Sequence, residues 1–166
     1  MRFQLGQRFA APVTDVADAF CDPRFYAELA ELPKLGQHEL LDRRVDGDRV
    51  HLQVRYRFAG ELSAAARAVL DPERLTWVEH AEHDLAARVV TFHIRPDHYA
   101  DRLTCHGRYR FEPDGDGTVR LADGEVKVKA LLVAGAVERA IVTGLTEHAQ
   151  DEVAIVERWL ARSTEG

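Results

Sequence analysis

One long helical pattern at the end of the chain limits the possible folds more than any other part of the sequence. It follows a series of strand-like segments. In VERAIVTGLTEHAQDEVAIVERWL (137–160), apolar residues recur every three or four positions. This spacing predicts a helix over about 134–162 with one buried stripe. At about 1.5 Å per residue, the helix is about 40 Å long. No other predicted element is long enough to cover a sheet, so the sheet must pack its apolar face against this helix.

Seven segments alternate apolar and polar residues, as strands with one buried face do. The first runs from Phe3 to Phe9, and the clearest hairpin is 38–58, where Asp46-Gly47 favours a tight turn between ELLDRRV and RVHLQVRYRF. The remaining strands are predicted at about 75–83, 86–95, 101–112 and 117–129. Together they predict an antiparallel meander.

Shorter helices are predicted between these strands. The segment PVTDVADAFCDPRFYAELAEL, which begins at Pro12, divides into two helices at Asp22-Pro23, because proline cannot continue a helix and restricts the residue before it. Pro33 and Gly36 end the second of them. The alanine-rich ELSAAARAVLDPERL predicts another short helix that ends before Asp71-Pro72. With 166 residues and no linker or repeat, we expect one domain, 1–166.

Composition argues against several function classes. The net charge is −6 and no basic stripe is present, which argues against nucleic acid as the main partner. No apolar run approaches the ~20 residues that cross a bilayer, and MRFQLGQRFAAP alternates instead of forming a signal segment. We therefore expect a cytoplasmic protein without stable membrane insertion. Cys21 and Cys105 match no metal or redox spacing, so we expect two buried, reduced thiols.

The order of elements and four segments support a family resemblance. The segments are RYRFAGEL, DPERLTWVE, RPDHYADRLTCHGRYRFEPDGDG and VERAIVTGLTEHAQDE. With them the whole chain resembles the START-like (SRPBCC) helix-grip superfamily, in a bacterial branch known only as a domain of unknown function. The resemblance implies an α+β fold: a seven-stranded curved antiparallel sheet around the C-terminal helix, with two short helices after the first strand. It also implies a cavity, which in relatives holds lipids, sterols, polyketides or plant hormones, but it brings no established catalytic residues.

The predicted helix stripe carries polar candidates where apolar residues are expected. Ile141, Gly144, Leu145, His148 and Glu152 lie on or beside one face. His148 and Glu152 are spaced i, i+4, close enough for the carboxylate to orient the ring of a general acid/base. Alternatively, Glu152 lies at the rim and a backbone group satisfies His148. Gly144 allows either close packing on a strand or room for a ligand.

The inner faces of the strands supply candidate walls of a ligand cavity. They are Val54, Tyr56, Phe58, Trp77, Cys105, Tyr109 and Phe111. A buried phenol needs a hydrogen-bond partner, so Tyr56 and Tyr109 are candidates to bind the polar end of a ligand. Strand parity places Glu79 inward after Trp77, where a carboxylate is costly unless it is paired or protonated.

Other polar motifs are interpreted as structure. RPDHYAD (95–101) combines carboxylates with a histidine, but Pro-Asp at a strand end is common turn chemistry. His80 and His83 lie on opposite faces of one strand and cannot easily share a metal. No glycine-rich nucleotide loop, nucleophile elbow or zinc-ligand pattern occurs, so we expect no cofactor and no metal.

Three functions remain open. The first is binding of a small hydrophobic or amphipathic molecule, lipid- or polyketide-like, by a monomer or weak homodimer. The second is an enzyme of the polyketide cyclase, aromatase or dehydratase type, with His148 as acid/base and Tyr56 or Tyr109 orienting the substrate. The third is a protein-interaction module that uses the outer sheet face, which carries Arg55, Arg57, Arg108 and Arg110.

Overall fold

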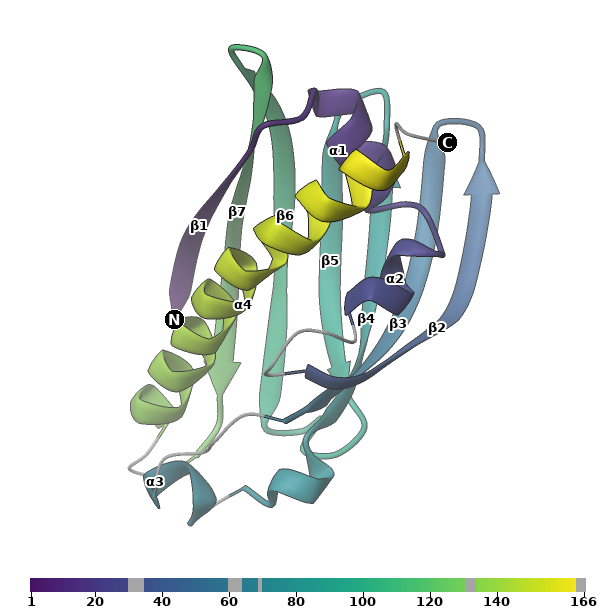
Figure 1. The fold of residues 1–166 in the computed structure, drawn as a ribbon. Coiled ribbons are helices and arrows are strands. Elements are labelled where there is room, and N and C mark those ends of the chain that lie inside the picture. The colour runs from purple at the N-terminus through teal and green to yellow at the C-terminus, as the bar shows by residue number, and fades with distance from the viewer. Residues whose placement is uncertain (30–34, 60–63, 69, 131–133, 164–166) are drawn as a thin grey trace.

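All seven predicted strands are present in the computed structural model, which describes residues 1–29, 35–59, 64–68, 70–130 and 134–163. They form one antiparallel sheet in the order β1-β7-β6-β5-β4-β3-β2 (Figure 1). The strands are β1 (Arg2–Phe9), β2 (Leu35–Asp46), β3 (Arg49–Phe58), β4 (Thr76–Asp84), β5 (Val89–Pro96), β6 (Leu103–Asp114) and β7 (Gly117–Val128). Every neighbouring pair is antiparallel, which confirms the predicted meander.

The long helix α4 (Ala134–Ser163) crosses the concave face of this sheet diagonally (Figure 1). It contacts β1 and β7 directly, and near its C-terminus it also contacts α1 (Val13–Ala19) and α2 (Phe25–Glu28). A short helix α3 (Ala64–Arg67) lies in the predicted alanine-rich segment. The predicted α+β architecture, a curved sheet around the C-terminal helix with two short helices after the first strand, is confirmed. Within the described residues, no helix combines the length and apolar character needed to cross a bilayer.

The turns explain where element boundaries differ from the prediction. β5 begins at Val89 rather than at 86 because Arg88 adopts a positive φ of 56° and the Asp84 carboxylate accepts a hydrogen bond from the Ala87 N–H (2.8 Å). Gly47 has a φ of 56°, as the predicted Asp46-Gly47 turn requires. The predicted helix end at Pro33 lies outside the described residues, and Gly36 belongs to β2.

The solid core lies where α1 and α2 cover the sheet. The ring of Phe20 contacts those of Phe9, Phe25 and Phe111, with centroids 5.5–6.3 Å apart. Val16 and Phe25 are completely buried there. The part of α4 between residues 137 and 152 faces a cavity instead. The helix therefore packs on the core near its C-terminus, and its N-terminal part borders the cavity.

Candidate functional site

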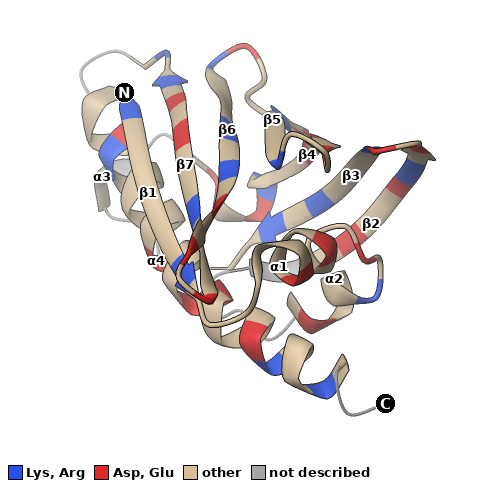
Figure 2. Cartoon of the chain, turned by 90° about the horizontal axis from the view of Figure 1, so that it is seen from above, with Lys and Arg blue, Asp and Glu red and all other residues tan. Residues whose placement is uncertain are grey.

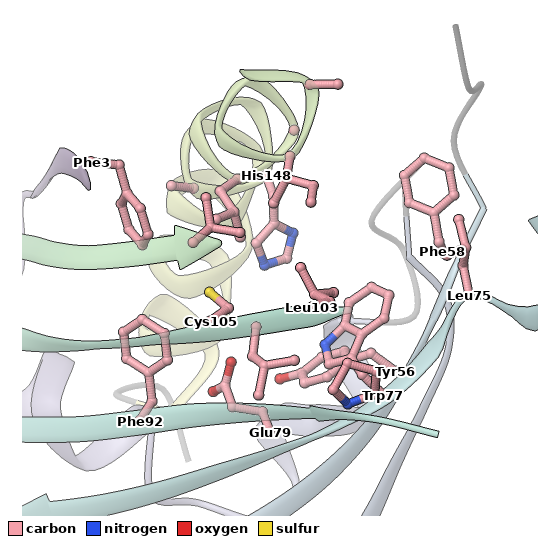
Figure 3. Close-up of a pocket in the computed structure, with 18 of the residues that line it drawn as sticks. Phe3, Tyr56, Phe58, Leu75, Trp77, Glu79, Phe92, Leu103, Cys105 and His148 are labelled. Atoms are coloured by element: carbon pink, nitrogen blue, oxygen red, sulfur yellow. The ribbon is translucent and has the colours of Figure 1, made fainter. Parts of the chain in front are cut away.

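A cavity of about 540 Å³ lies between the concave face of the sheet and α4 (Figure 3). Side chains from β1 and β3–β7 form its wall on the sheet side, and α4 forms the opposite wall. Most of the lining side chains are apolar or aromatic, among them Phe3, Phe92 and Leu103 of the strands and Leu75 just before β4 (Figure 3). The volume lies within the ~300–1,000 Å³ that is usual for small-molecule sites.

Nine of the eleven side chains predicted as ligand-binding line this cavity. They are Tyr56, Phe58, Trp77, Cys105, Tyr109, Ile141, Gly144, Leu145 and His148. The other two, Val54 and Phe111, are only 2% and 4% exposed and belong to the solid core. The ring of Phe20, which does line the cavity, packs against Phe111 with centroids 5.8 Å apart.

Gly144 faces open space. A Cβ built on it would meet no heavy atom within 4 Å, so this glycine is not a close-packing position. Of the two predicted roles for Gly144, room in the cavity is the one that fits this geometry.

Glu152 is paired with a buried arginine. Its Oε2 accepts hydrogen bonds from Arg120 Nη1 (2.8 Å) and from Gln7 Nε2 (3.0 Å), and the Gln7 Oε1 accepts one from the same Arg120 nitrogen (3.0 Å). Gln7 also donates to the carbonyl of Ala149 (2.6 Å), which ties β1 to α4. The three side chains are 5–8% exposed. A buried ion pair is tolerated only when its charges are paired, and here the Arg120 Nη1 and the Glu152 Oε2 pair directly, while the Arg120 Nε has no hydrogen-bond partner among the described residues.

The guanidinium of Arg120 is further held between two aromatic rings. Its carbon lies 3.9 Å from the ring centroid of Phe20 and 3.8 Å from that of Tyr109. Stacking on both faces suits the planar, weakly hydrated guanidinium and fixes its orientation. Arg120 is therefore committed to Glu152 and Gln7 by hydrogen bonds and to the core by stacking.

His148 lies on the cavity wall, as the helix pattern predicted (Figure 3). Its Nε2 is 4.0 Å from Glu152 Oε1, which is longer than a hydrogen bond. The predicted orientation of the ring by Glu152 is therefore absent, because Glu152 points to Arg120 and is buried rather than at the rim. The Nδ1 of His148 is also buried and has no hydrogen-bond partner among the described residues. The imidazole thus has unsatisfied hydrogen-bonding capacity inside the cavity.

Glu79 points from β4 into the cavity, as strand parity predicted (Figure 3). Burial raises the pKa of this carboxyl from 4.5 to about 7; the positive charge of Arg120 opposes the rise and the negative charge of Glu152 adds to it. Within the described part of the chain, no side chain forms an ion pair or hydrogen bond with Glu79. It is a carboxyl in an apolar wall that titrates near neutral pH.

The phenols and thiols around Glu79 stay protonated near neutral pH. Burial raises the pKa values of Tyr56 and Tyr109, and the Glu79 charge raises both further. Burial also raises the pKa of Cys105 to about 12, so this thiol is not a ready nucleophile. Cys21 and Cys105 are both buried and unpaired, as predicted.

The motifs that were interpreted as structure lie apart from one another. RPDHYAD covers the end of β5 and the turn that leads to β6, where Tyr99 has a φ of 62° and its hydroxyl accepts a hydrogen bond from the Asp71 N–H (3.1 Å). His83 faces inward, while His80 faces outward and stacks on His93 (centroids 4.6 Å apart). Across the described residues, no three potential metal ligands gather in one place.

The outer sheet face is charged but mixed, with basic and acidic residues alternating along the strands (Figure 2). The four arginines of the interaction hypothesis have acidic neighbours: Arg55 with Asp97 (3.5 Å), Arg57 with Glu73 (3.7 Å), and Arg108 and Arg110 with Asp123 (3.2 and 4.0 Å). This pairing leaves no uniform basic patch among them. The use of this face by a protein partner stays a prediction.

Sequence reasoning missed two polar residues of the interior, Gln7 and Arg120. Both occupy inward positions of alternating strands: Gln7 follows Phe3 and Leu5, and Arg120 lies between Thr118 and Ala122. Strict parity along β1 and β7 was the signal that identifies them.

Comparisons with known proteins agree with this fold. Residues 4–160 match a family described as "Protein of unknown function (DUF2505)". No protein with a curated description matches the chain in sequence. An aromatase/cyclase from Streptomyces sp. R1128 is similar in structure, with a TM-score of 0.61 and 16% identity over 99% of this chain and 95% of that one.

Two further solved structures are similar. A norcoclaurine synthase from Thalictrum flavum has a TM-score of 0.66 and 17% identity, over 97% of this chain and 86% of that one. A START superfamily protein from Mycobacterium smegmatis has a TM-score of 0.60 and 17% identity, over 97% of both chains. At such identities the likeness shows the fold, and it confirms the predicted START-like helix-grip architecture.

Proposed function

The chain belongs to the DUF2505 family, and from that premise we propose that it binds a small hydrophobic or amphipathic molecule between its sheet and α4. The observation that carries the proposal is the cavity of about 540 Å³ with its largely apolar wall. Protein interiors are normally packed without voids larger than a water molecule, so an apolar space of this size is unusual unless a ligand fills it.

Gly144 offers a direct test, because the cavity is open above its Cα. Gly144→Leu puts a branched side chain into this space and also raises helix propensity by up to about 1 kcal/mol. We expect the variant to bind a fluorescent hydrophobic probe, anilinonaphthalene sulfonate, at least about tenfold more weakly than the wild type, which corresponds to about 1.4 kcal/mol. Its thermal midpoint should not fall.

Gly135→Leu is the matched control. It lies on the same helix outside the cavity wall, and an added Cβ there meets only the end of Arg139 at 3.5 Å. Probe binding should survive in this variant. Native mass spectrometry of the purified wild type should in addition detect a co-purifying apolar molecule. Equal probe binding by both glycine variants contradicts the proposal.

A second candidate function is that of an enzyme acting on a polyketide-like carbonyl compound. It is favoured by His148, which lines the same cavity as Glu79 and Tyr56 and whose buried Nδ1 has no hydrogen-bond partner among the described residues. An aromatase/cyclase and a norcoclaurine synthase share the fold, and fold alone does not assign chemistry. The test is the mass of a β-polycarbonyl thioester after incubation. Loss of water with the wild type and not with His148→Gln supports the enzyme, and an unchanged mass contradicts it.

A further inference from the structure

We propose that Glu79 makes the cavity selective for amphipathic amines, whose ammonium group pairs with this carboxylate while the apolar body fills the rest of the space. The inference rests on the proposed function, since it names the chemical class of the ligand for the same cavity. It is carried by what surrounds Glu79 and by what the other polar groups of the interior already bind.

Several of the other polar side chains that point inward have protein partners, whereas the buried Nδ1 of His148 has none among the described residues. Gln7, Arg120 and Glu152 hydrogen-bond to one another, Tyr26 donates its hydroxyl hydrogen to the Phe20 carbonyl (2.9 Å), and His83 contacts Cys21 Sγ (3.2 Å). Glu79 has no such partner among the described residues. An inward carboxylate without a cation is costly in an apolar wall, and a ligand that brings the cation removes this cost.

Arg120 is the only inward arginine near Glu79 in the described chain, and it is not free to serve this carboxylate. One of its terminal nitrogens is already shared between Glu152 and Gln7, and the rings of Phe20 and Tyr109 cover both faces of the guanidinium. Turning toward Glu79 would break the ion pair and the stacking together. No arginine or lysine among the described residues forms an ion pair with Glu79, so an ammonium ligand would supply the cation that this carboxylate lacks.

Aromatic rings surround the place where an ammonium group would lie. Tyr56 and Trp77 stack with centroids 5.9 Å apart beside the Glu79 carboxyl (Figure 3). Phe92 and Tyr109 form a second stacked pair, 4.9 Å apart, on the neighbouring strands, and the Arg120 guanidinium already covers one face of Tyr109. The electron-rich faces of such rings attract a desolvated cation and have no comparable attraction for an alcohol.

The pKa of Glu79 gives this recognition a pH dependence. At about 7, it leaves the carboxyl half-ionised near neutral pH, and only the ionised form pairs with an ammonium. Most of the buried ionisable groups of the cavity wall stay uncharged there: burial raises the pKa values of Tyr26, Tyr56, Tyr109 and Cys105, and lowers that of His83 to about 4. The other ionisable groups of the cavity wall include the Arg120–Glu152 pair, Glu147 and His148 of α4, and the residues at the surface end, Arg74, His98, Arg102 and Lys129. Substitution of Glu79 alone leaves all of these in place.

The surface end of the cavity is positively charged, in contrast to the carboxylate of Glu79 inside it. Exposed Arg74, Arg102 and Lys129 line it there, and they would attract an anionic head group left at the opening. Arg74 already stacks on Tyr99 (5.5 Å) and contacts His98, and Arg102 has Asp101 at 3.8 Å. A carboxylate ligand is therefore the sharpest rival, and the experiment has to include it.

The experiment compares three probes with the same apolar body: decylamine, decanol and decanoic acid. Calorimetric titration of the intact protein at about pH 8, where Glu79 is ionised, should show decylamine binding at least about tenfold more tightly than decanol. Decanoic acid should bind no better than decanol. Lowering the pH to about 6 should weaken decylamine binding about tenfold and leave decanol unchanged, because each pH unit below the pKa removes most of the carboxylate.

Glu79→Gln removes the charge at constant shape and should abolish both the amine preference and its pH dependence. Glu82→Gln is the matched control, since Glu82 lies on the outer face of the same strand and pairs with Arg49 (2.6 Å). Its probe ranking should equal that of the wild type. Equal binding of the three probes, tightest binding of decanoic acid, or an amine preference that survives in Glu79→Gln overturns the inference while leaving the cavity as a binding site. No binding of any probe contradicts the proposed function as well.

Discussion

Two carboxylates, Glu152 and Glu79, point into the same interior from opposite walls, and their surroundings give them opposite roles. Glu152 comes from the helix and is held by Arg120 and Gln7 at 2.8 and 3.0 Å. Glu79 comes from the sheet, faces the cavity, and has no such partner among the described residues. The difference shows that burial alone does not decide what a polar residue does. A carboxylate whose charge is neutralised inside the protein is part of its architecture, whereas one left unpaired is available to a ligand or a proton.

The largest effect is expected when the cation that pairs with Glu152 is removed. Arg120→Met leaves Glu152 buried without its counter-charge, so we expect the free energy of unfolding to fall by about 3–5 kcal/mol, measured by urea denaturation. The double variant Arg120→Met/Glu152→Leu removes both charges and should recover most of that loss. A single variant that loses less than about 1 kcal/mol would show that the pair is not a structural element.

The contribution of Glu79 to the free energy of unfolding should depend on pH. The pKa of Glu79 is about 7 in the folded protein against 4.5 as its ordinary value, so the folded state keeps a proton that the unfolded chain releases. This contribution to stability is complete below about pH 4.5 and is lost as the pH rises through about 7. We expect it to amount to roughly 2 kcal/mol, allowing for partial exposure of the side chain to the cavity.

Glu79→Gln should therefore be more stable than the wild type at about pH 8 and nearly equal to it at about pH 4.5. Urea unfolding across this range measures the difference, with Glu82→Gln as the control that follows the wild type. A parallel pH dependence in Glu79→Gln and the wild type would mean that another group carries the titration.

The architecture was predictable because it depends on periodicity. Alternation located the strands, the three- to four-residue repeat located α4, and the parity of Trp77 placed Glu79 inward. The pairing of the carboxylates was not predictable in this way. Glu152 has a histidine one helical turn away, and the i, i+4 rule pointed to His148. The actual partner is Arg120 on a separate strand, and only the three-dimensional packing of α4 across β1 and β7 brings the two together.

The same limit explains which predicted wall residues belong to the core. Val54 and Tyr56 have the same parity on β3, yet only Tyr56 lines the cavity. Parity predicts the face of a sheet on which a side chain lies. It does not predict where along that face the covering helices end. At Phe111, the ring of Phe20 packs against the side chain, so Phe111 lies in the core.

The smallest expected effect concerns the electrostatic interaction between Glu152 and Glu79. The negative charge of Glu152 contributes to the raised pKa of Glu79, and Arg120 opposes it from the position where Glu152 holds it. In Glu152→Gln this negative charge is gone and the guanidinium is released from its ion pair, so both changes favour ionised Glu79. We expect the pKa of Glu79 to fall by about one unit, equivalent to about 1.4 kcal/mol, measured by NMR titration of carboxyl-labelled glutamate. An unchanged Glu79 pKa in a folded Glu152→Gln protein would show that the charge of Glu152 does not act on Glu79.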